Sequence, residues 1–173
     1  MNFKKILAGA LLTSLFACQS VFAADLSKLI IMHTNDTHGY DQRADGINGI
    51  ATLKDLKDEF ESQGYNVLLV DAGDAIQDNN LVNFSKGHVA LDFMNAAGYD
   101  VSILGNHEFD YGMDVFLDLN KQSKTGYYCA NFMDLRSGKQ VLPGYKLMTF
   151  EDVKVAFVGA CTPSSLTESS KSS

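Results

Sequence analysis

The sequence predicts a layered α/β domain, and three observations lead to that prediction. Short apolar runs that end in turn-forming residues alternate with segments in which apolar residues recur at helical spacing. The elements follow one another as strand, helix and strand, which is the order of a parallel crossover unit. The chain has 173 residues, enough for one compact domain with its own core, and shows no internal repeat or linker.

The first half of the chain supplies the first crossover unit. The run KLIIMH at residues 28–33 predicts a buried strand, which is followed by a long polar loop. Apolar residues from Ile47 to Phe60 recur at helical spacing, and Gly64 ends this predicted helix. The run NVLLVDA at residues 66–72 predicts the next strand and closes the unit.

The second half repeats the alternation and then becomes rich in strands. A helix, a strand, a helix and three further strands are predicted, in that order, at residues 87–97, 101–104, 113–122, 127–132, 145–150 and 154–159. A tight turn between the last two strands predicts a hairpin. The final segment, SSLTESSKSS at residues 164–173, is polar and Ser-rich, so we expect a disordered tail.

The first residues are typical of an export signal. Lys4 and Lys5 precede an apolar run of 12 residues, and VFA at 21–23 offers a cleavage site, so residues 1–23 are predicted to be a signal peptide. The apolar run is too short to cross a membrane, and nothing later in the chain is long and apolar enough. We expect a periplasmic or secreted protein, with a lipid anchor on Cys18 as the alternative.

The charge of the chain argues against one class of partner. The formal net charge is −7, and it becomes −9 when residues 1–23, which hold two lysines and no acid, are removed. A chain this acidic is not expected to bind nucleic acid.

Two cysteines remain after residue 23, and both lie in apolar segments that are predicted to be strands. Outside the cytoplasm Cys129 and Cys161 could form a disulfide. They could equally be buried thiols that pack as small apolar groups. The sequence leaves both alternatives open.

Three clusters of polar residues each follow a predicted parallel strand. In chain order they are Asp36 with His38, then Asp74, then Asn106 with His107 and Asp110. Loops after the carboxyl ends of such strands converge on one crevice, so these side chains can meet there. Carboxylate, amide oxygen and imidazole suit manganese, zinc, iron or magnesium. Turns and helix caps use the same residues, so a shared metal site and three separate structural motifs remain alternatives at this point.

Three segments resemble the signature motifs of a known family. They are IIMHTNDTHG, LLVDAGDAIQ and GYDVSILGNHEFDYG, at residues 30–39, 68–77 and 98–112. In this order they resemble the 5'-nucleotidase branch of the calcineurin-like metallophosphoesterases. The chain is similar to the N-terminal part of that phosphoesterase domain, over residues 24–163. The resemblance implies an α/β/β/α sandwich that is incomplete at its C-terminal side.

The resemblance also implies a centre of two divalent metal ions. The ions could be Mn, Zn, Fe, Co or Mg. Asp36 and His38 would bind one of them, Asp74 would bridge both, and Asn106 would bind the second. Each of these residues occupies a matching position of a family motif.

The implied reaction is the hydrolysis of a phosphoester in a small molecule, a 5'-nucleotide or a related phosphomonoester. A metal-bound hydroxide would attack phosphorus. His107 would stabilise the developing charge or protonate the leaving oxygen, and Asp110 would orient its ring. We expect Glu108 to point away from the metals, and His33 either to pack within the fold or to support a metal ligand without binding a metal itself.

The resemblance stops short of a complete metal centre. Family members supply further histidines from a later stretch, and this sequence contains no histidine after His107. One expectation is that a longer product or a second chain supplies the missing half. The alternative is a non-catalytic remnant that folds partly and binds at most one cation. Either way we expect an exposed apolar patch or an unpaired strand edge.

Overall fold

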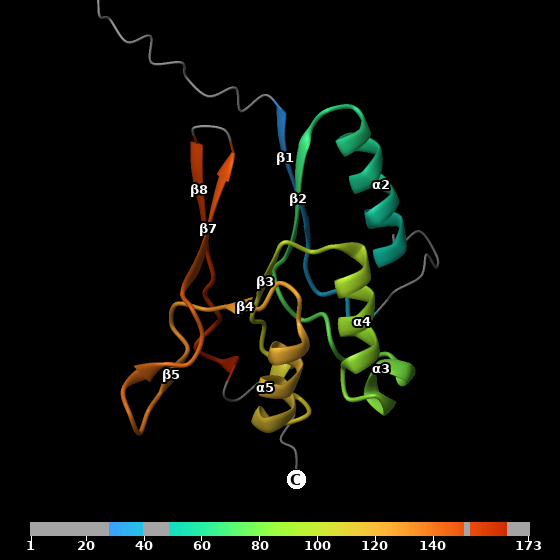
Figure 1. Ribbon diagram of the computed structural model, residues 1–173. Coiled ribbons are helices and arrows are strands. Elements are labelled where there is room, and N and C mark those ends of the chain that lie inside the picture. Colours follow the sequence, from blue (N-terminus) through green and yellow to red (C-terminus); the bar gives the residue numbers. More distant parts are fainter. Residues whose placement is uncertain (1–27, 40–48, 151–152, 166–173) are drawn as a thin grey trace, which may run out of the picture.

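Four parallel strands form the central sheet of the computed structural model, which describes residues 28–39, 49–150 and 153–165. The strands lie in the order β1-β2-β3-β4, and each pairs in parallel with the next (Figure 1). Their bounds are β1 Leu29–Thr34, β2 Asn66–Asp71, β3 Val101–Ile103 and β4 Tyr127–Tyr128. The predicted α/β fold with a parallel sheet is therefore confirmed.

Helices connect the successive strands and cover one face of the sheet. They are α2 Ile50–Ser62, α3 Asn80–Phe84, α4 His88–Ala97, a 3-10 helix His107–Phe109 and α5 Met113–Gln122. Because the strands follow sequence order and parallel crossovers are right-handed, successive helices fall on the same side. Figure 1 shows α2 and α4 together beside β1 and β2. The main core forms there, where Leu69 of β2 packs with Ile50 of α2 and Met94 of α4.

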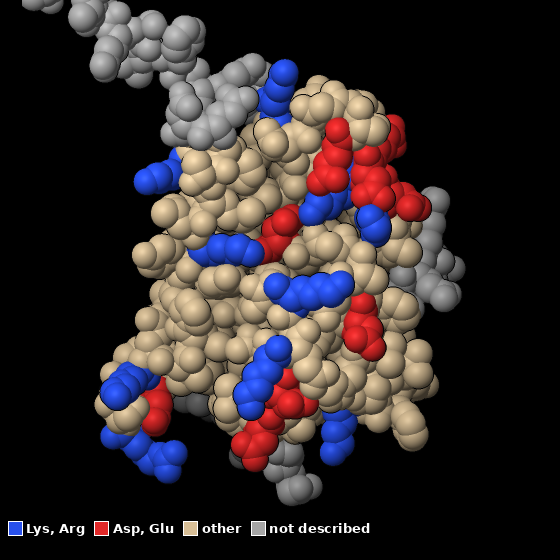
Figure 2. All heavy atoms as spheres, viewed as in Figure 1, with Lys and Arg blue, Asp and Glu red and all other residues tan. Residues whose placement is uncertain are grey.

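An antiparallel hairpin of β7 (Tyr145–Phe150) and β8 (Val153–Val158) stands on the other side of β1 and β2 (Figure 1). It confirms the predicted hairpin. Large apolar side chains are exposed on these strands, with Leu147 at 52% and Val158 at 67% of their area. Figure 2 shows Asp and Glu side chains gathered over α2, whereas the surface over the hairpin is mostly uncharged.

Some short elements differ from the prediction. The predicted strand at residues 127–132 ends after two residues as β4, because the backbone N–H of Cys129 donates to the carbonyl of Pro143 instead of continuing the sheet. A small hairpin of β5 (Met133–Asp134) and β6 (Lys139–Gln140) follows, and it was not predicted. His33 is exposed on β1, so the expectation that it packs within the fold is wrong, and the alternative that it supports a metal ligand stays a prediction.

The two ends of the chain lie largely outside the described residues. This applies to the predicted signal peptide at residues 1–23, to Cys18 and to residues 166–173 of the predicted tail. Before that, Ser165 is buried and its hydroxyl donates to the carbonyl of Thr162. No helix in the described part of the chain is long and apolar enough to cross a membrane.

Candidate metal centre

The predicted polar clusters all lie at the carboxyl ends of the parallel strands. Asp36 and His38 lie in the loop after β1, Asp74 lies in the loop after β2, and Asn106 precedes the 3-10 helix after β3. The first two loops run side by side, because the backbone N–H groups of Asp36 and His38 donate to the carbonyls of Gly73 and Asp74, at 2.9 and 3.0 Å. The pairing of β1 with β2 thus continues into the loops.

The backbone at three candidate ligands adopts the left-handed conformation. The φ angle is 52° at Asp36, 51° at His38 and 59° at Asp74. This region is unfavourable for residues with a side chain and costs on the order of 1 kcal/mol at each position. The hydrogen bonds between the two loops hold the conformation, as is typical of positions that bind a ligand.

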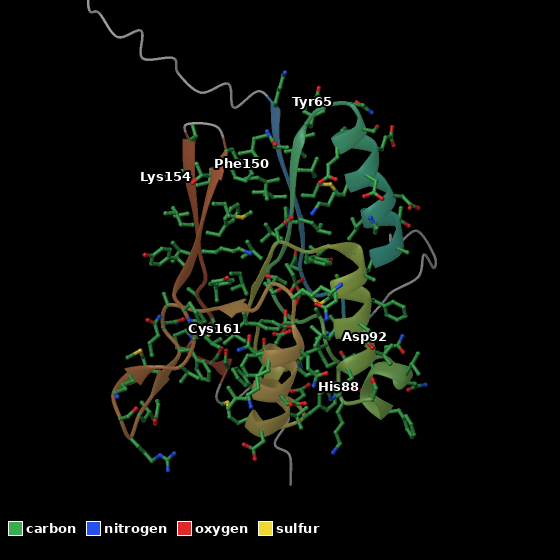
Figure 3. All side chains as sticks on the ribbon, in the orientation of Figure 1. Tyr65, His88, Asp92, Phe150, Lys154 and Cys161 are labelled. Atoms are coloured by element: carbon green, nitrogen blue, oxygen red, sulfur yellow. The ribbon has the colours of Figure 1, made fainter. Side chains whose placement is uncertain are left out.

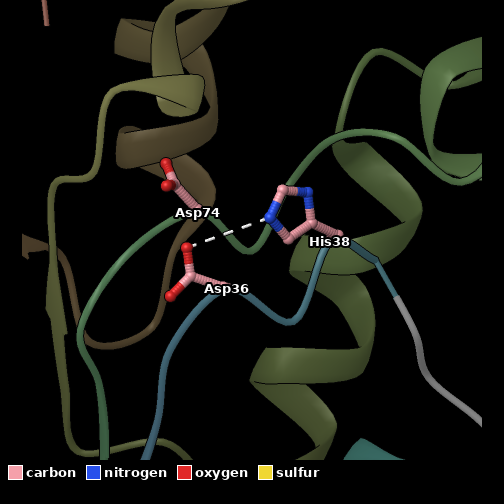
Figure 4. Close-up of side chains that lie close together, drawn as sticks. All are labelled: Asp36, His38 and Asp74. Carbon is pink, nitrogen blue, oxygen red and sulfur yellow. Dashed lines mark ion pairs between the residues drawn. The ribbon is translucent and has the colours of Figure 1, made fainter.

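These three side chains converge (Figure 4). Asp36, His38 and Asp74 each offer one ligand atom, and these atoms all lie within 4.8 Å of one another. His38 Nε2 is 3.9 Å from Asp36 Oδ1. Asp74 is buried, whereas the Asp36 side chain is 60% exposed, so one side of the group is open to solvent.

The donor set fits a divalent cation. Two carboxylates that approach this closely repel each other, and among the described residues neither forms an ion pair with a lysine or an arginine. A cation between Asp36 and Asp74 would relieve that repulsion. Two carboxylate oxygens and an imidazole nitrogen are ligands that Mn²⁺, Zn²⁺ and Fe²⁺ accept.

The ring of His38 is held from behind by residues of the loop after β2. Its Nδ1 lies 2.6 Å from Asp78 Oδ2, the shorter of two contacts, and 3.0 Å from the side-chain nitrogen of Gln77, which can donate only to an unprotonated Nδ1. A proton on Nδ1 that is donated to Asp78 leaves the lone pair of Nε2 free on the side of Asp36. A carboxylate behind a ligating histidine fixes the tautomer in this way in many metal sites.

His107 lies beside the same group but is held by a different carboxylate. Its Nδ1 is 2.8 Å from Asp110 Oδ2, and the centroids of the His107 and His38 rings are 5.7 Å apart. Partial burial lowers the pKa of His107, but the hydrogen bond and the charge of Asp110 outweigh that effect, so the pKa is raised. The cationic form of His107 is thereby favoured.

The loops after β2 and β3 touch because of two glycines. A Cβ on Gly105 would collide with the carboxylate of Asp74, and a Cβ on Gly73 would collide with the backbone nitrogen of Gly105. The backbone N–H of His107 can therefore donate to Asp74 Oδ1, at 2.8 Å. This bond ties the candidate bridging carboxylate to the loop that carries Asn106 and His107.

Glu108 joins the same two loops from below. Its buried carboxylate accepts hydrogen bonds from the backbone N–H groups of Asp74 at 3.0 Å, Ala75 at 3.0 Å and Gly105 at 2.6 Å. Burial raises the pKa of Glu108 to about 7, against the lowering effect of these donors. Both carboxylate oxygens of Glu108 are therefore used by backbone donors. The only sign of this role in the sequence is the position of an acid between two candidate site residues.

A second buried acid lies beneath the site. Asp71, at the end of β2, accepts hydrogen bonds from the hydroxyl of Thr34 and the backbone N–H of Gly73. Burial, with the charge of Glu108 added to it, raises the pKa of Asp71 to about 8. Two carboxyl groups therefore support the loops from within the protein, in addition to those that face the crevice.

The structure thus brings Asp36, His38 and Asp74 into one group, with His107 hydrogen-bonded to its edge. Asp110 acts on that group through His107. Asn106 is half-buried and adjoins His107 in the chain, and its role as a ligand of a second metal stays a prediction.

Comparison with known proteins identifies the family to which this chain belongs. The sequence model of the calcineurin-like phosphoesterases matches residues 29–158, which is more than half of the chain. The chain belongs to that family of metal-binding phosphoesterases. Within the family it is related to the 5'-nucleotidases, as the sequence motifs predicted.

Individual relatives show the extent of the likeness. The chain is 34% identical to a 5'-nucleotidase of Vibrio parahaemolyticus over 92% of this chain and 30% of that relative. It is also 34% identical to a snake venom 5'-nucleotidase of Gloydius brevicauda, over 81% of this chain and 26% of the venom protein. The chain therefore spans about a third or less of the length of these relatives.

Solved structures agree with this placement. The NAD nucleotidase of Haemophilus influenzae superposes with a TM-score of 0.71 at 27% identity, covering 81% of this chain and 27% of that protein. A 5'-nucleotidase precursor of Thermus thermophilus gives a TM-score of 0.70 at 29% identity, over 80% of this chain and 29% of that protein. The fold is thus that of the N-terminal region of these proteins.

Proposed function

We propose that this chain carries the first part of the metal centre of an exported phosphoesterase that hydrolyses 5'-nucleotides or related phosphomonoesters. The observation that carries the proposal is the convergence of Asp36, His38 and Asp74 beside His107. The names of the relatives support the substrate class. Export rests on the sequence of residues 1–23.

Asp36, His38 and Asp74 would hold one divalent ion, and Asp74 with Asn106 would contact a second. Ions bound there would polarise the phosphoryl oxygens and make water a better nucleophile at neutral pH. The residues of this chain supply the positioning. Asp78 fixes the tautomer of His38, and Glu108 holds the backbone at Asp74.

His107 would handle a proton during the reaction. Asp110 occupies its Nδ1, so Nε2 is the nitrogen that is left to act on a substrate. Because the pKa of His107 is raised, Nε2 carries a proton over more of the neutral range. That N–H can stabilise negative charge on a phosphoryl oxygen, or the proton can pass to the leaving oxygen of the ester.

The test is the release of phosphate from AMP and from p-nitrophenyl phosphate by the purified chain, with Mn²⁺ and with a chelator. We expect release to need Mn²⁺ and to fall by about 10² to 10⁴-fold in His107→Ala. The matched control is His88→Ala, because His88 lies on α4 (Figure 3) and is not one of the residues that converge at the site.

Binding of Mn²⁺ to the same samples is measured by calorimetry. If a folded chain binds Mn²⁺ and releases no phosphate, catalysis by this chain alone is contradicted. The same result favours the alternative of a non-catalytic chain that binds at most one cation. If it neither binds Mn²⁺ nor releases phosphate, the metal centre itself is contradicted.

A further inference from the structure

Two cysteines that are far apart in the sequence lie side by side where the β7–β8 hairpin meets the parallel sheet. Cys129 directly follows β4 and Cys161 lies shortly after β8. Their Sγ atoms are 3.6 Å apart, although 32 positions separate the two residues in the chain. Cys161 lies close to β4, at the foot of the hairpin (Figure 3).

The backbone around the two cysteines is fixed without any help from the sulfur atoms. The N–H of Ala130 donates to the carbonyl of Gly159 at 2.8 Å, and the N–H of Gly159 donates to the carbonyl of Gly144 at 3.2 Å. A Cβ on Gly159 would collide with the carbonyl of Tyr128, so the end of β8 lies directly against the end of β4. The positions of the two cysteine backbones are therefore set by their neighbours.

The side chain of Asn131 forms hydrogen bonds with both cysteines. Its side-chain oxygen accepts the backbone N–H of Cys161 at 3.0 Å and the thiol of Cys129 at 3.1 Å. Its side-chain nitrogen donates to the carbonyl of Cys161 at 2.8 Å. A disulfide has an S–S distance of about 2.05 Å, so the sulfurs must approach by only about 1.5 Å, which small side-chain rotations can supply.

We propose that Cys129 and Cys161 form a reversible disulfide that fastens the β7–β8 hairpin to the parallel sheet. Among the described strands, β7 and β8 pair only with each other, so they are joined to the sheet by loops and local contacts. The bond would close a long loop between β4 and the end of β8. Cross-links of that kind stabilise a fold by restricting its unfolded chain.

The exposure of the two thiols decides which of them reacts first with a low-molecular-weight disulfide. Cys161 is half-buried and Cys129 is fully buried, so Cys161 meets the reagent first. Its thiolate attacks one sulfur of the reagent, and one thiol leaves. Cys129 then loses its proton and attacks Cys161 Sγ, which releases the second thiol. Two protein thiols are oxidised, and one external disulfide is reduced to two thiols.

The pH affects the rate of this reaction. Burial and the neighbouring Cys129 thiol raise the pKa of Cys161, so its reactive thiolate form is scarce at neutral pH. The experiment is therefore run at alkaline pH. The purified full-length chain is incubated with oxidised glutathione, remaining thiols are alkylated, and the product is digested with trypsin and analysed by mass spectrometry.

The expected product is a cross-link between tryptic peptides 125–136 and 155–171, which contain Cys129 and Cys161. We also expect the Tm of the oxidised chain to exceed that of the reduced chain by about 5 °C. The Tm of Cys161→Ser, which replaces the more exposed cysteine, should not respond to the redox state. Cys18 falls in a different peptide and is therefore scored separately.

The proposal is overturned if both peptides are recovered alkylated, or if Cys161 is recovered only as a mixed disulfide with glutathione. A cross-link that leaves the Tm unchanged or lowers it would contradict the proposal that the disulfide stabilises the fold. The wild-type comparison stands even if Cys161→Ser fails to fold, because it uses one protein in two redox states.

Discussion

The loops after β1 and β3 each present a histidine whose Nδ1 is held by a carboxylate, yet the two histidines face different surroundings. His38 is held by Asp78, and its Nε2 lies 3.9 Å from the carboxylate of Asp36. His107 is held by Asp110, and its backbone rather than its ring contacts Asp74. The same pairing of histidine with carboxylate can therefore serve two purposes.

The difference lies in the charge that each ring nitrogen meets. Converging carboxylates around His38 Nε2 make a cation the natural partner, and a neutral imidazole can ligate it. His107 has a raised pKa, which favours a proton on the ring instead. We therefore propose that the His38 ring binds metal and that the His107 ring handles a proton, and the substitutions that follow test these roles and the contacts that hold the site together.

The largest effect is expected from Asp74→Asn, which removes the carboxylate between the two loops. Loss of a residue that only supports a ligand commonly costs 10 to 100-fold in metal affinity, so loss of the ligand itself should raise the Kd for Mn²⁺ by more than about 100-fold. Calorimetry measures the Kd. Asp92→Asn, at an exposed position of α4, makes the same chemical change and should leave the Kd unaltered (Figure 3). If Asp74→Asn and Asp92→Asn bind Mn²⁺ equally well, Asp74 is not a metal ligand.

A smaller loss of affinity is expected from Asp78→Asn. The amide no longer favours a proton on His38 Nδ1, so the Kd for Mn²⁺ should rise by about 10 to 100-fold. Asp110→Asn is the matched control, because it makes the same change behind His107. If Asp110→Asn weakens Mn²⁺ binding as much as Asp78→Asn does, the proposed division of roles between His38 and His107 is wrong.

Glu108→Gln tests what holds the two loops together. The amide group of glutamine would face a backbone N–H donor where a carboxylate oxygen now accepts one, so the free energy of unfolding should fall by about 1 to 3 kcal/mol. Urea denaturation measures this change. Glu61→Gln, an exposed position at the end of α2, is the control and should change little. Unchanged stability of Glu108→Gln would show that the three hydrogen bonds of Glu108 are dispensable.

The smallest effect is expected from Asp110→Asn on the titration of His107. Asp110 raises the pKa of His107, so the pKa should fall in the variant and the ring should lose its proton at lower pH. NMR titration of the histidine ring protons measures this. Asp78→Asn should leave the His107 titration much nearer to that of the wild type. An unchanged pKa in Asp110→Asn would mean that the hydrogen bond at Nδ1 does not control the proton on His107.

Much of the fold was predictable because its strands are continuous apolar runs. LIIMHT and NVLLVD are bounded by polar residues, and their predicted limits differ from the observed ones by a residue at each end at most. Very short elements could not be predicted in this way. The five residues of α3 are capped by Asn79 and contain too few turns for a period to show. The strands β5 and β6 have two residues each, too few for an alternation of apolar and polar residues to show.

Part of the site was predictable because its polar residues directly follow the parallel strands. Asp36, His38 and Asp74 could be expected to meet because parallel strands end at one edge of a sheet. Their left-handed backbone could not be expected, because it depends on hydrogen bonds between two loops. Asp78 and Glu108 were missed for the same reason, since each acts on a partner that lies more than 30 positions away in the sequence.

The most direct test of the account compares the affinity for Mn²⁺ of His38→Ala with that of His107→Ala, measured by calorimetry on folded protein. We predict that His38→Ala raises the Kd by more than about 100-fold, because it removes a ligand, and that His107→Ala leaves the Kd within about threefold of the wild type. Equal losses in the two variants, or a larger loss in His107→Ala, would contradict the proposal that His38, and not His107, is the histidine that binds the metal.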